Sequence, residues 1–300
     1  MKQILSFCFT LWVLLTLTFV LIRVIPGDPF ADEQALPKEI HAGLQTKYGL
    51  DLPWYKQYMR YLQSVVTWDF GPSFKYKNRT VNQIINEGFP VSAVLGLESL
   101  LLAISAGIFL GTLSAIYVSG WQNQAATLIA TLGISIPSFI IATMLQYLFS
   151  IKLGVFPVAR WGSFTQTILP AISLAALPAA FLMRMIKSNL LEVMKKDYIK
   201  SARARGISET KIIINHALKN VLLPILPYLG QMSANILVGS FVIEKIFGIP
   251  GLGQWFVTSV IHRDYTVIIG VTVFYGIILL TTVSICDALY RSLDPRLERR

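Results

Sequence analysis

The chain has 300 residues, of which 54% are hydrophobic and only 14% are charged. A soluble domain carries about 25% charged residues, so this deficit excludes an ordinary soluble fold and indicates a chain embedded in lipid. The formal net charge is +10. On a soluble protein such a charge would suggest a nucleic-acid partner, but its distribution along this chain points to membrane topology instead.

Six segments are long and apolar enough to cross a membrane, which takes about 20 mostly apolar residues. They lie at roughly 4–25, 93–118, 126–150, 168–186, 221–243 and 267–290. The first segment could be a cleaved signal peptide, but its uncharged run from Leu5 to Ile22 is longer than usual and no small-residue cleavage site follows. Pro170 and Pro178 are expected to interrupt the fourth segment. We therefore expect an all-α membrane protein with six transmembrane helices, the first of them retained.

The basic residues gather on one side of this arrangement. Residues 184–219 hold nine Lys or Arg against three acidic residues, whereas residues 26–90 hold seven of each kind. Because cytoplasmic loops carry the excess of Lys and Arg, we expect the loop 187–220 and both termini to be cytoplasmic. The predicted organisation is a first helix (1–25), an external segment (26–92), a core of five membrane helices (93–290) and a cytoplasmic tail (291–300).

The external segment is predicted to be mainly helical. A helix should run from Pro37 to Lys47, since proline is favoured in a first turn. Trp54 to Trp68 has the pattern of an amphipathic helix, and its aromatic residues suit the headgroup level of a bilayer. Another short helix is expected over 81–87, ended by the Gly88 and Pro90 that follow.

No segment carries the motifs of an enzyme or of a self-powered pump. The chain has no Gly-x-x-x-x-Gly-Lys-Ser/Thr phosphate loop, no His-Glu-x-x-His and no Gly-x-Ser-x-Gly, and it has only three histidines. Cys8 and Cys286 both fall near cytoplasmic ends of their spans, which is a reducing setting. We therefore expect no catalytic, cofactor-binding or metal-binding residues, and no ATP hydrolysis by this chain itself.

An ion-coupled secondary transporter is the rival interpretation, because ionisable groups inside a membrane are costly and often mark a pathway. Glu98 is the charged residue that lies within a span, whereas Arg23, Arg184 and Asp287 lie near ends. Uncharged polar residues could also line a route. The candidate pathway residues are Glu98, Gln146, Gln231, Ser233 and Asn235. Helix–helix hydrogen bonding is the alternative role for the uncharged four, and interfacial solvation or pairing for Glu98.

The segment Asp197–Gly206 of the cytoplasmic loop has the composition of a docking surface. Small residues alternate with basic ones, so another protein can approach closely while the arginines bind carboxylates or carbonyls at the rim. Gly206 can end the helix in a left-handed cap. The residues assigned to this surface are Asp197, Lys200, Ser201, Ala202, Arg203, Ala204, Arg205 and Gly206. A solvated basic loop held by anionic lipid explains the same composition equally well.

Asp197–Gly206, continued by His216–Pro224, resembles the cytoplasmic loop of ABC importer permeases. In the general motif, Glu-Ala-Ala is followed by three residues, Gly, nine residues and Ile-x-Leu-Pro. Here Lys200-Ser201-Ala202 replaces Glu-Ala-Ala, and the stretch from Gly206 to Pro224 is five residues longer. The longer form is that of the dipeptide and oligopeptide branch of these permeases.

Further segments are similar to the same branch. They are Arg23–Pro29, Tyr48–Pro53, Ile134–Phe139, Val242–Gly253, Arg263–Tyr265 and Leu293–Pro295. Asp69–Lys77 with Phe89–Ala93 most resembles the B-type permease subunit of oligopeptide importers. The resemblance covers nearly the whole chain and implies the type I ABC importer permease fold.

The resemblance implies a subunit of a bacterial inner membrane that forms half of a translocation pathway for oligopeptides. Its partners would be a second related permease, two cytoplasmic ATPases and an extracytoplasmic peptide-binding protein, with membrane lipid around it and no nucleic acid. ATP would close the ATPase dimer, and the 197–206 helix would move with its ATPase and switch the pathway between two packings. Related permeases also carry nickel complexes, murein peptides or sugars, so a different cargo remains the alternative.

The charge distribution predicts which loops a membrane-impermeant thiol reagent can reach. A cysteine at Ser73 should be labelled in whole cells and a cysteine at Ser208 should not, because only the first is expected to be external. Labelling at position 208 in intact cells would contradict the orientation.

Overall fold

The computed structural model describes residues 2–24, 43, 46, 49–76, 78–237 and 239–293. Most of the predicted helix 37–47, the segment 26–29 and the tail from residue 294 lie outside these residues. In the described part the regular elements are helices, apart from one isolated bridge between Pro72 and Thr80. The chain packs as two units, residues 1–91 with 250–280 and residues 92–249 with 281–300.

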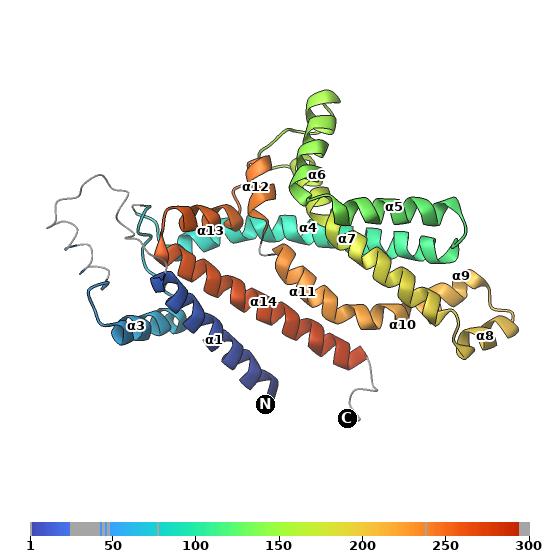
Figure 1. Ribbon diagram of the computed structural model, residues 1–300, viewed down its shortest axis with the longest axis horizontal. Helices are drawn as coiled ribbons and strands as arrows, with labels where there is room; N and C mark the ends of the chain where they lie inside the picture. The colour runs from blue at the N-terminus through green and yellow to red at the C-terminus, as the bar shows by residue number, and fades with distance from the viewer. Residues whose placement is uncertain are drawn as a thin grey trace. The chain divides into compact units, whose positions relative to one another are not determined.

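The helices divide between the units as follows (Figure 1). The first unit contains α1 (Lys2–Val24), α3 (Trp54–Thr67), the start of α4 (Val81–Ile116), α13 (Leu252–Ile261) and the first part of α14 (Tyr265–Leu293). The second contains the rest of α4 and α14 together with α5 (Trp121–Ser135), α6 (Ser138–Leu145), the π-helix η1 (Gln146–Lys152), α7 (Phe164–Val193), α8 (Asp197–Ala204), α9 (Glu209–Lys211), the π-helix η2 (Ile212–Ala217), α10 (Leu218–Leu222), the 3-10 turn η3 (Leu223–Ile225), α11 (Leu226–Leu237) and α12 (Phe241–Phe247). The amphipathic helix expected at 54–68 is confirmed as α3.

Five described segments are long and apolar enough to cross a membrane. They are Leu5–Val24, Val81–Ile116, Phe164–Val193, Glu209–Leu237 and Tyr265–Leu293. A sixth candidate is the pair Trp121–Ser135 and Ser138–Lys152, whose two helices meet at an angle of 109°. The all-helical membrane fold is confirmed, and six spans result when the bent pair counts as one.

The third predicted span, 126–150, is wrong as a single straight helix. Ile136 ends α5 in an extended conformation with φ −92° and ψ 121°, and α6 begins directly after Pro137. Proline lacks a backbone N–H and disfavours the helical conformation of the residue before it. The bend therefore lies where a proline permits a break in an otherwise apolar run.

The fifth predicted span, 221–243, ends too late. α11 stops at Leu237, and Gly239 has φ +88°, in the left-handed region that glycine adopts at little cost. Ser240 then caps α12 by accepting a hydrogen bond from the Ile243 amide. Two short helices, α12 and α13, follow this span before α14 begins.

Two other predicted interruptions are absent from the described helices. α4 runs continuously from Val81 through Pro90, so the separate helix 81–87 is wrong. Gly88 instead provides close packing, because a Cβ there would lie 3.1 Å from the backbone of Leu252. α7 likewise continues through Pro170 and Pro178. Neighbouring helices can satisfy or shield the carbonyls that such prolines leave free.

The first unit has its own apolar core, and the second is built around α7. In the first unit, Leu15 and Phe19 of α1 pack with Tyr61 of α3 and with apolar residues of α4 and α14. In the second unit, α5 lies beside α7 (Figure 1). Gly107 and Gly111 of α4 face α7 so closely that a Cβ would lie 2.5 Å and 2.8 Å from side chains of α7.

One buried carboxylate organises the polar contacts of the first unit. Asp264 is fully buried, directly before α14. Its side chain accepts hydrogen bonds from the Ser73 hydroxyl and from Phe74 N (3.2 Å), Lys75 N (3.3 Å), Thr266 Oγ1 (2.9 Å) and Val267 N (3.3 Å). This carboxylate therefore caps the last span and fixes the 73–75 turn at the same time. Ser73 is itself buried (4% exposed), so the expectation that a cysteine at position 73 is labelled is wrong, and Asp69, which is exposed in the same segment predicted to be external, is the position at which to place the cysteine.

Asp264→Ala should destabilise the protein by about 3 kcal/mol, because buried donors left without an acceptor are costly. Asp69→Ala is the matched control, since Asp69 is exposed and its side chain accepts one local bond from the Gly71 amide at 3.1 Å. Thermal unfolding in detergent should show a large drop in Tm for the first variant and little for the second. Equal drops would contradict the role assigned to Asp264.

Candidate functional site

The predicted docking segment forms a short helix with a defined start. α8 covers Asp197–Ala204, after Lys196 in an extended conformation. The Asp197 carboxylate lies in the first turn, where it complements the positive end of the helix dipole. Asp197 also forms an exposed ion pair with Lys200 at 2.9 Å.

Glycine ends this helix, as predicted. Gly206 has φ +77°, and its amide donates to the Arg203 carbonyl at 2.9 Å. The Ile207 amide donates to the Ala202 carbonyl at 3.3 Å, which completes the Schellman pattern of hydrogen bonds. A Cβ at position 206 would meet nothing within 4 Å. Glycine is therefore favoured here by backbone conformation and not by crowding within this chain.

The helix has one buried face and one exposed face. Ile199 and Ala202 are buried, 0% and 1% exposed, in a cluster with Ile212, Ala217 and Val221. The other residues assigned to the docking surface are exposed: Asp197, Lys200, Ser201, Arg203, Ala204, Arg205 and Gly206. Assigning the Ala202 side chain to that surface is therefore wrong, since it packs inside the protein.

An ion pair links the end of α8 to the next helix. Arg203 donates to both carboxylate oxygens of Glu209, at 2.6 Å and 3.1 Å. Hydrogen bonding to this carboxylate raises the pKa of Arg203. The pair lies at a cavity whose other walls are apolar residues of α4, α7 and η2. Arg203 is thus bound to Glu209 of the same loop. Arg205 is exposed on the surface of the protein.

α8 is also attached to the base of the Glu209–Leu237 span. The Asn220 amide donates to the Tyr198 hydroxyl at 3.0 Å and to the His216 carbonyl at 2.9 Å. Together with the buried face of α8, this contact joins α8 to η2 and α10.

The candidate pathway residues occupy different environments. Gln146 donates to the carbonyls of Val158 (2.7 Å) and Ile246 (3.3 Å), so it joins parts of the second unit. Ser233 is buried. Gln231 and Asn235 are exposed one turn apart on α11, and Glu98 on α4 is half-buried. The structure therefore brings only Gln231 and Asn235 onto one exposed helix face.

Sequence reasoning missed one buried acidic residue in the second unit. Glu244 is fully buried on α12 and accepts a hydrogen bond from the Ser92 hydroxyl at 2.7 Å. Gly239 lies so close to this carboxylate that a Cβ would collide with it. An acidic residue in a mostly apolar stretch, directly before Lys245, was the available signal. In the described part of the chain, no three His, Cys, Asp or Glu side chains gather as a metal site would require.

Known proteins similar to this chain are transport permeases. Residues 107–299 match the family described as binding-protein-dependent transport system inner membrane component. The dipeptide transport system permease protein DppB of Bacillus subtilis is 45% identical over 297 residues, covering 99% of this chain and 96% of that protein. The oligopeptide transport system permease protein OppB of Haemophilus influenzae is 39% identical, covering 99% and 97%.

A solved structure supports the fold independently. An inward-facing conformation of the MetNI methionine ABC transporter aligns with a TM-score of 0.60 at 18% identity, covering 71% of this chain and 97% of the other. At this identity the likeness concerns the fold alone. The family match and the full-length relatives go further: the chain belongs to the family of inner-membrane components of binding-protein-dependent transport systems.

Proposed function

We propose that the chain is the permease subunit of an ATP-driven peptide importer, forming half of the translocation pathway and the contact through which cytoplasmic ATPases drive it. The observation that carries this proposal is α8, an exposed basic helix ended by Gly206 whose opposite face is buried against the base of a membrane span. Such a helix can be moved by a partner and can transmit that movement.

The proposed cargo is short peptides. The relatives at 39–45% identity over nearly their whole length are named for dipeptide or oligopeptide transport. Oligopeptides remain the cargo that we favour, on the resemblance of 69–77 and 89–93 to the B-type subunits. Selection of peptide length is assigned to a separate extracytoplasmic binding protein.

The proposed assembly contains a second related permease, two ATPases and that binding protein. We place the chain in a bacterial inner membrane with both termini and residues 187–220 cytoplasmic, and with 26–92 external. The domain limits 1–25, 26–92, 93–290 and 291–300 describe this topology. Its support is the nine-to-three excess of basic over acidic residues at 184–219.

Coupling is proposed to proceed by movement of α8 with its ATPase. ATP can bias the membrane part only if the ATPase contacts α8 differently in its two states. The exposed residues Lys200, Ser201 and Arg205 would form that contact, along with Asp197, Arg203, Ala204 and Gly206. Movement of α8 would then pass through the Tyr198–Asn220 bond and the buried Ile199 to α10 and α11.

α11 would carry this movement to the pathway. Gln231 and Asn235 are exposed on one face of α11, where contact with lipid tails would leave their amides without partners. A pathway or a second permease would satisfy them. Glu98, Gln146 and Ser233 stay weaker candidates, because Gln146 already bonds two carbonyls and Ser233 is buried.

Gly206→Glu should abolish coupling without unfolding the membrane helices. The new side chain adds backbone strain of roughly 1 kcal/mol at positive φ. It also forces a carboxylate toward the ATPase, where an unpaired buried charge costs several kcal/mol. ATPase activity stimulated by the binding protein should fall at least tenfold in the purified complex.

Two control variants separate the effect of backbone strain from the effect of the added charge. Gly206→Ala adds the strain without the charge and has open space for its Cβ, so it should retain most activity. Ser208→Glu adds the charge two residues further on, at an exposed position, and should also be mild. Normal transport by stably expressed Gly206→Glu would show that α8 is not the docking surface.

The purified chain alone should bind no ATP, since it has no phosphate loop. Equilibrium binding of a labelled ATP analogue, with the complete complex as the positive control, measures this. Saturable binding of ATP to the single chain would contradict the assignment of ATP binding and hydrolysis to separate ATPase subunits. Peptide uptake driven by an ion gradient in vesicles holding only this chain would favour the secondary transporter instead.

A further inference from the structure

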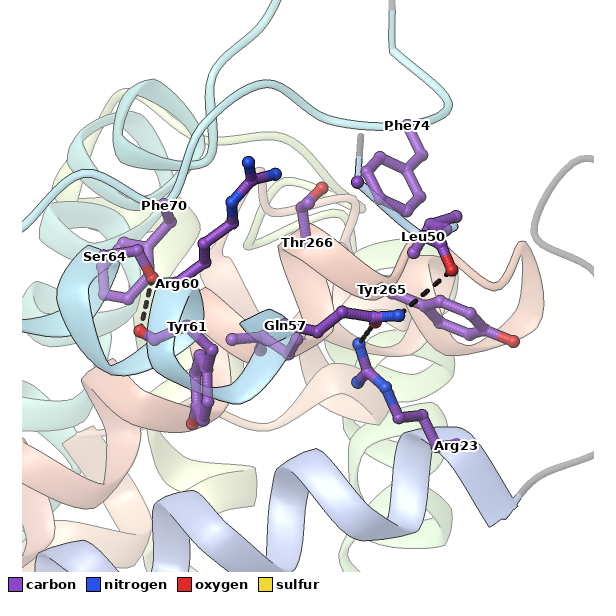
Figure 2. A pocket seen from close by; sticks show the side chains of 12 residues that line it. Arg23, Leu50, Gln57, Arg60, Tyr61, Ser64, Phe70, Phe74, Tyr265 and Thr266 are labelled. Atoms are coloured by element: carbon purple, nitrogen blue, oxygen red, sulfur yellow. Dashed lines mark hydrogen bonds between the residues drawn. The ribbon is translucent and has the colours of Figure 1, made fainter. Parts of the chain in front are cut away.

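The first unit contains a pocket of about 180 Å³ that has no part in the transport mechanism proposed above. Figure 2 shows side chains from α1, α3 and α14 and from the segments around Leu50 and Phe74 converging on it. Its walls combine two arginines, Arg23 and Arg60, with the apolar or aromatic side chains of Leu50, Tyr61, Phe70, Phe74 and Tyr265. A cavity with two cations and aromatic walls suits an anion that carries an apolar part.

Among the residues that the structure describes, Arg23 is held in place by neutral groups. Its guanidinium lies 3.8 Å from the centre of the Phe19 ring and donates a hydrogen bond to Gln57 Oε1 (Figure 2). Gln57 in turn donates to the carbonyls of Leu50 (3.0 Å) and Leu52 (2.7 Å). This chain of bonds, all to neutral groups of the described residues, positions the cation at the pocket.

Arg60 enters the same pocket from α3. Its guanidinium lies against Gly49, so closely that a Cβ at that position would collide with it. Gly49 has φ +66°, which glycine adopts without strain. Among the residues that the structure describes, neither Arg23 nor Arg60 forms an ion pair, and the Asp264 carboxylate behind Thr266 is already occupied by hydrogen-bond donors.

The position of the pocket points to lipid as the source of the anion. Arg23 is the penultimate residue of the Leu5–Val24 span, where a membrane helix reaches the headgroup level. α3, which carries Arg60, exposes Trp54 (66%), Tyr55 (66%) and Val66 (86%) on its outer face. Aromatic and apolar residues on the open face of an amphipathic helix are typical of a helix lying in the membrane interface.

We propose that this pocket binds the phosphate of an anionic phospholipid, held by Arg23 and Arg60. Guanidinium groups match phosphate oxygens in a forked geometry, and the aromatic walls receive the adjoining carbons of the headgroup. A zwitterionic lipid binds less well, because its own cation approaches the two arginines. The bound lipid ties α1, α3 and α14 together at one depth in the membrane.

The test titrates the purified importer complex with short-chain phosphatidylglycerol, phosphatidylcholine or inorganic phosphate and follows the apparent Tm of this chain. Phosphatidylglycerol should raise Tm by about 5 °C at saturation, and the other two should do much less. The shift should be lost in Arg60→Gln and in Arg23→Gln/Arg60→Gln. Lys56→Gln removes an exposed cation of α3 outside the pocket and should keep the shift.

Native mass spectrometry provides a second measurement, with retention of phosphatidylglycerol lost at least fivefold in Arg60→Gln. Because Arg60 is exposed, this single variant should fold even if the double variant does not. An unchanged shift and unchanged retention in Arg60→Gln would overturn the proposal. An equal shift with inorganic phosphate would overturn the assignment to lipid. Both experiments measure lipid binding and not transport. Their outcome therefore does not depend on whether the chain transports peptides.

Discussion

Backbone hydrogen bonding inside lipid is the constraint on which the rest of the structure depends. Each N–H and C=O in the hydrocarbon region needs a partner from the protein, which is why the described spans are helices. Breaks then occur where a residue supplies a special conformation or a compensating bond. The left-handed Gly239 with the cap at Ser240, and the extended Ile136 before Pro137, are two such places.

The number and type of the spans could be predicted because they depend on composition averaged over about 20 residues. Their limits could not, because single residues decide them through packing. Pro90, Pro170 and Pro178 lie inside continuous helices, whereas Pro137 bends its span by 109°. The same residue type gives opposite outcomes, since tertiary neighbours and not the proline alone determine whether the helix continues.

The candidate site could likewise be predicted only in its local features. The left-handed Gly206 could be predicted from the sequence, because backbone conformation at a helix end is local. Which residues of α8 face outward could not, since Ser201 and Ala202 are equally small and only the second packs on Val221 and its neighbours. The contacts of Tyr198 and Gln146 join residues 22 and 100 positions apart, which no local pattern encodes.

The Asp264 carboxylate also constrains the order in which the first unit can form. Its donors at Ser73, Phe74 and Lys75 precede it by 191, 190 and 189 residues. At a synthesis rate of about 5–20 residues per second, these donors exist for roughly 10–40 s before their acceptor is made. During that interval the 73–75 turn has local bonds, such as those from the Lys75 and Tyr76 amides to the Ser73 hydroxyl, but lacks its buried acceptor. The first unit therefore acquires its final arrangement late. Its 73–75 turn can be fixed only after Asp264 and the last span have been synthesised.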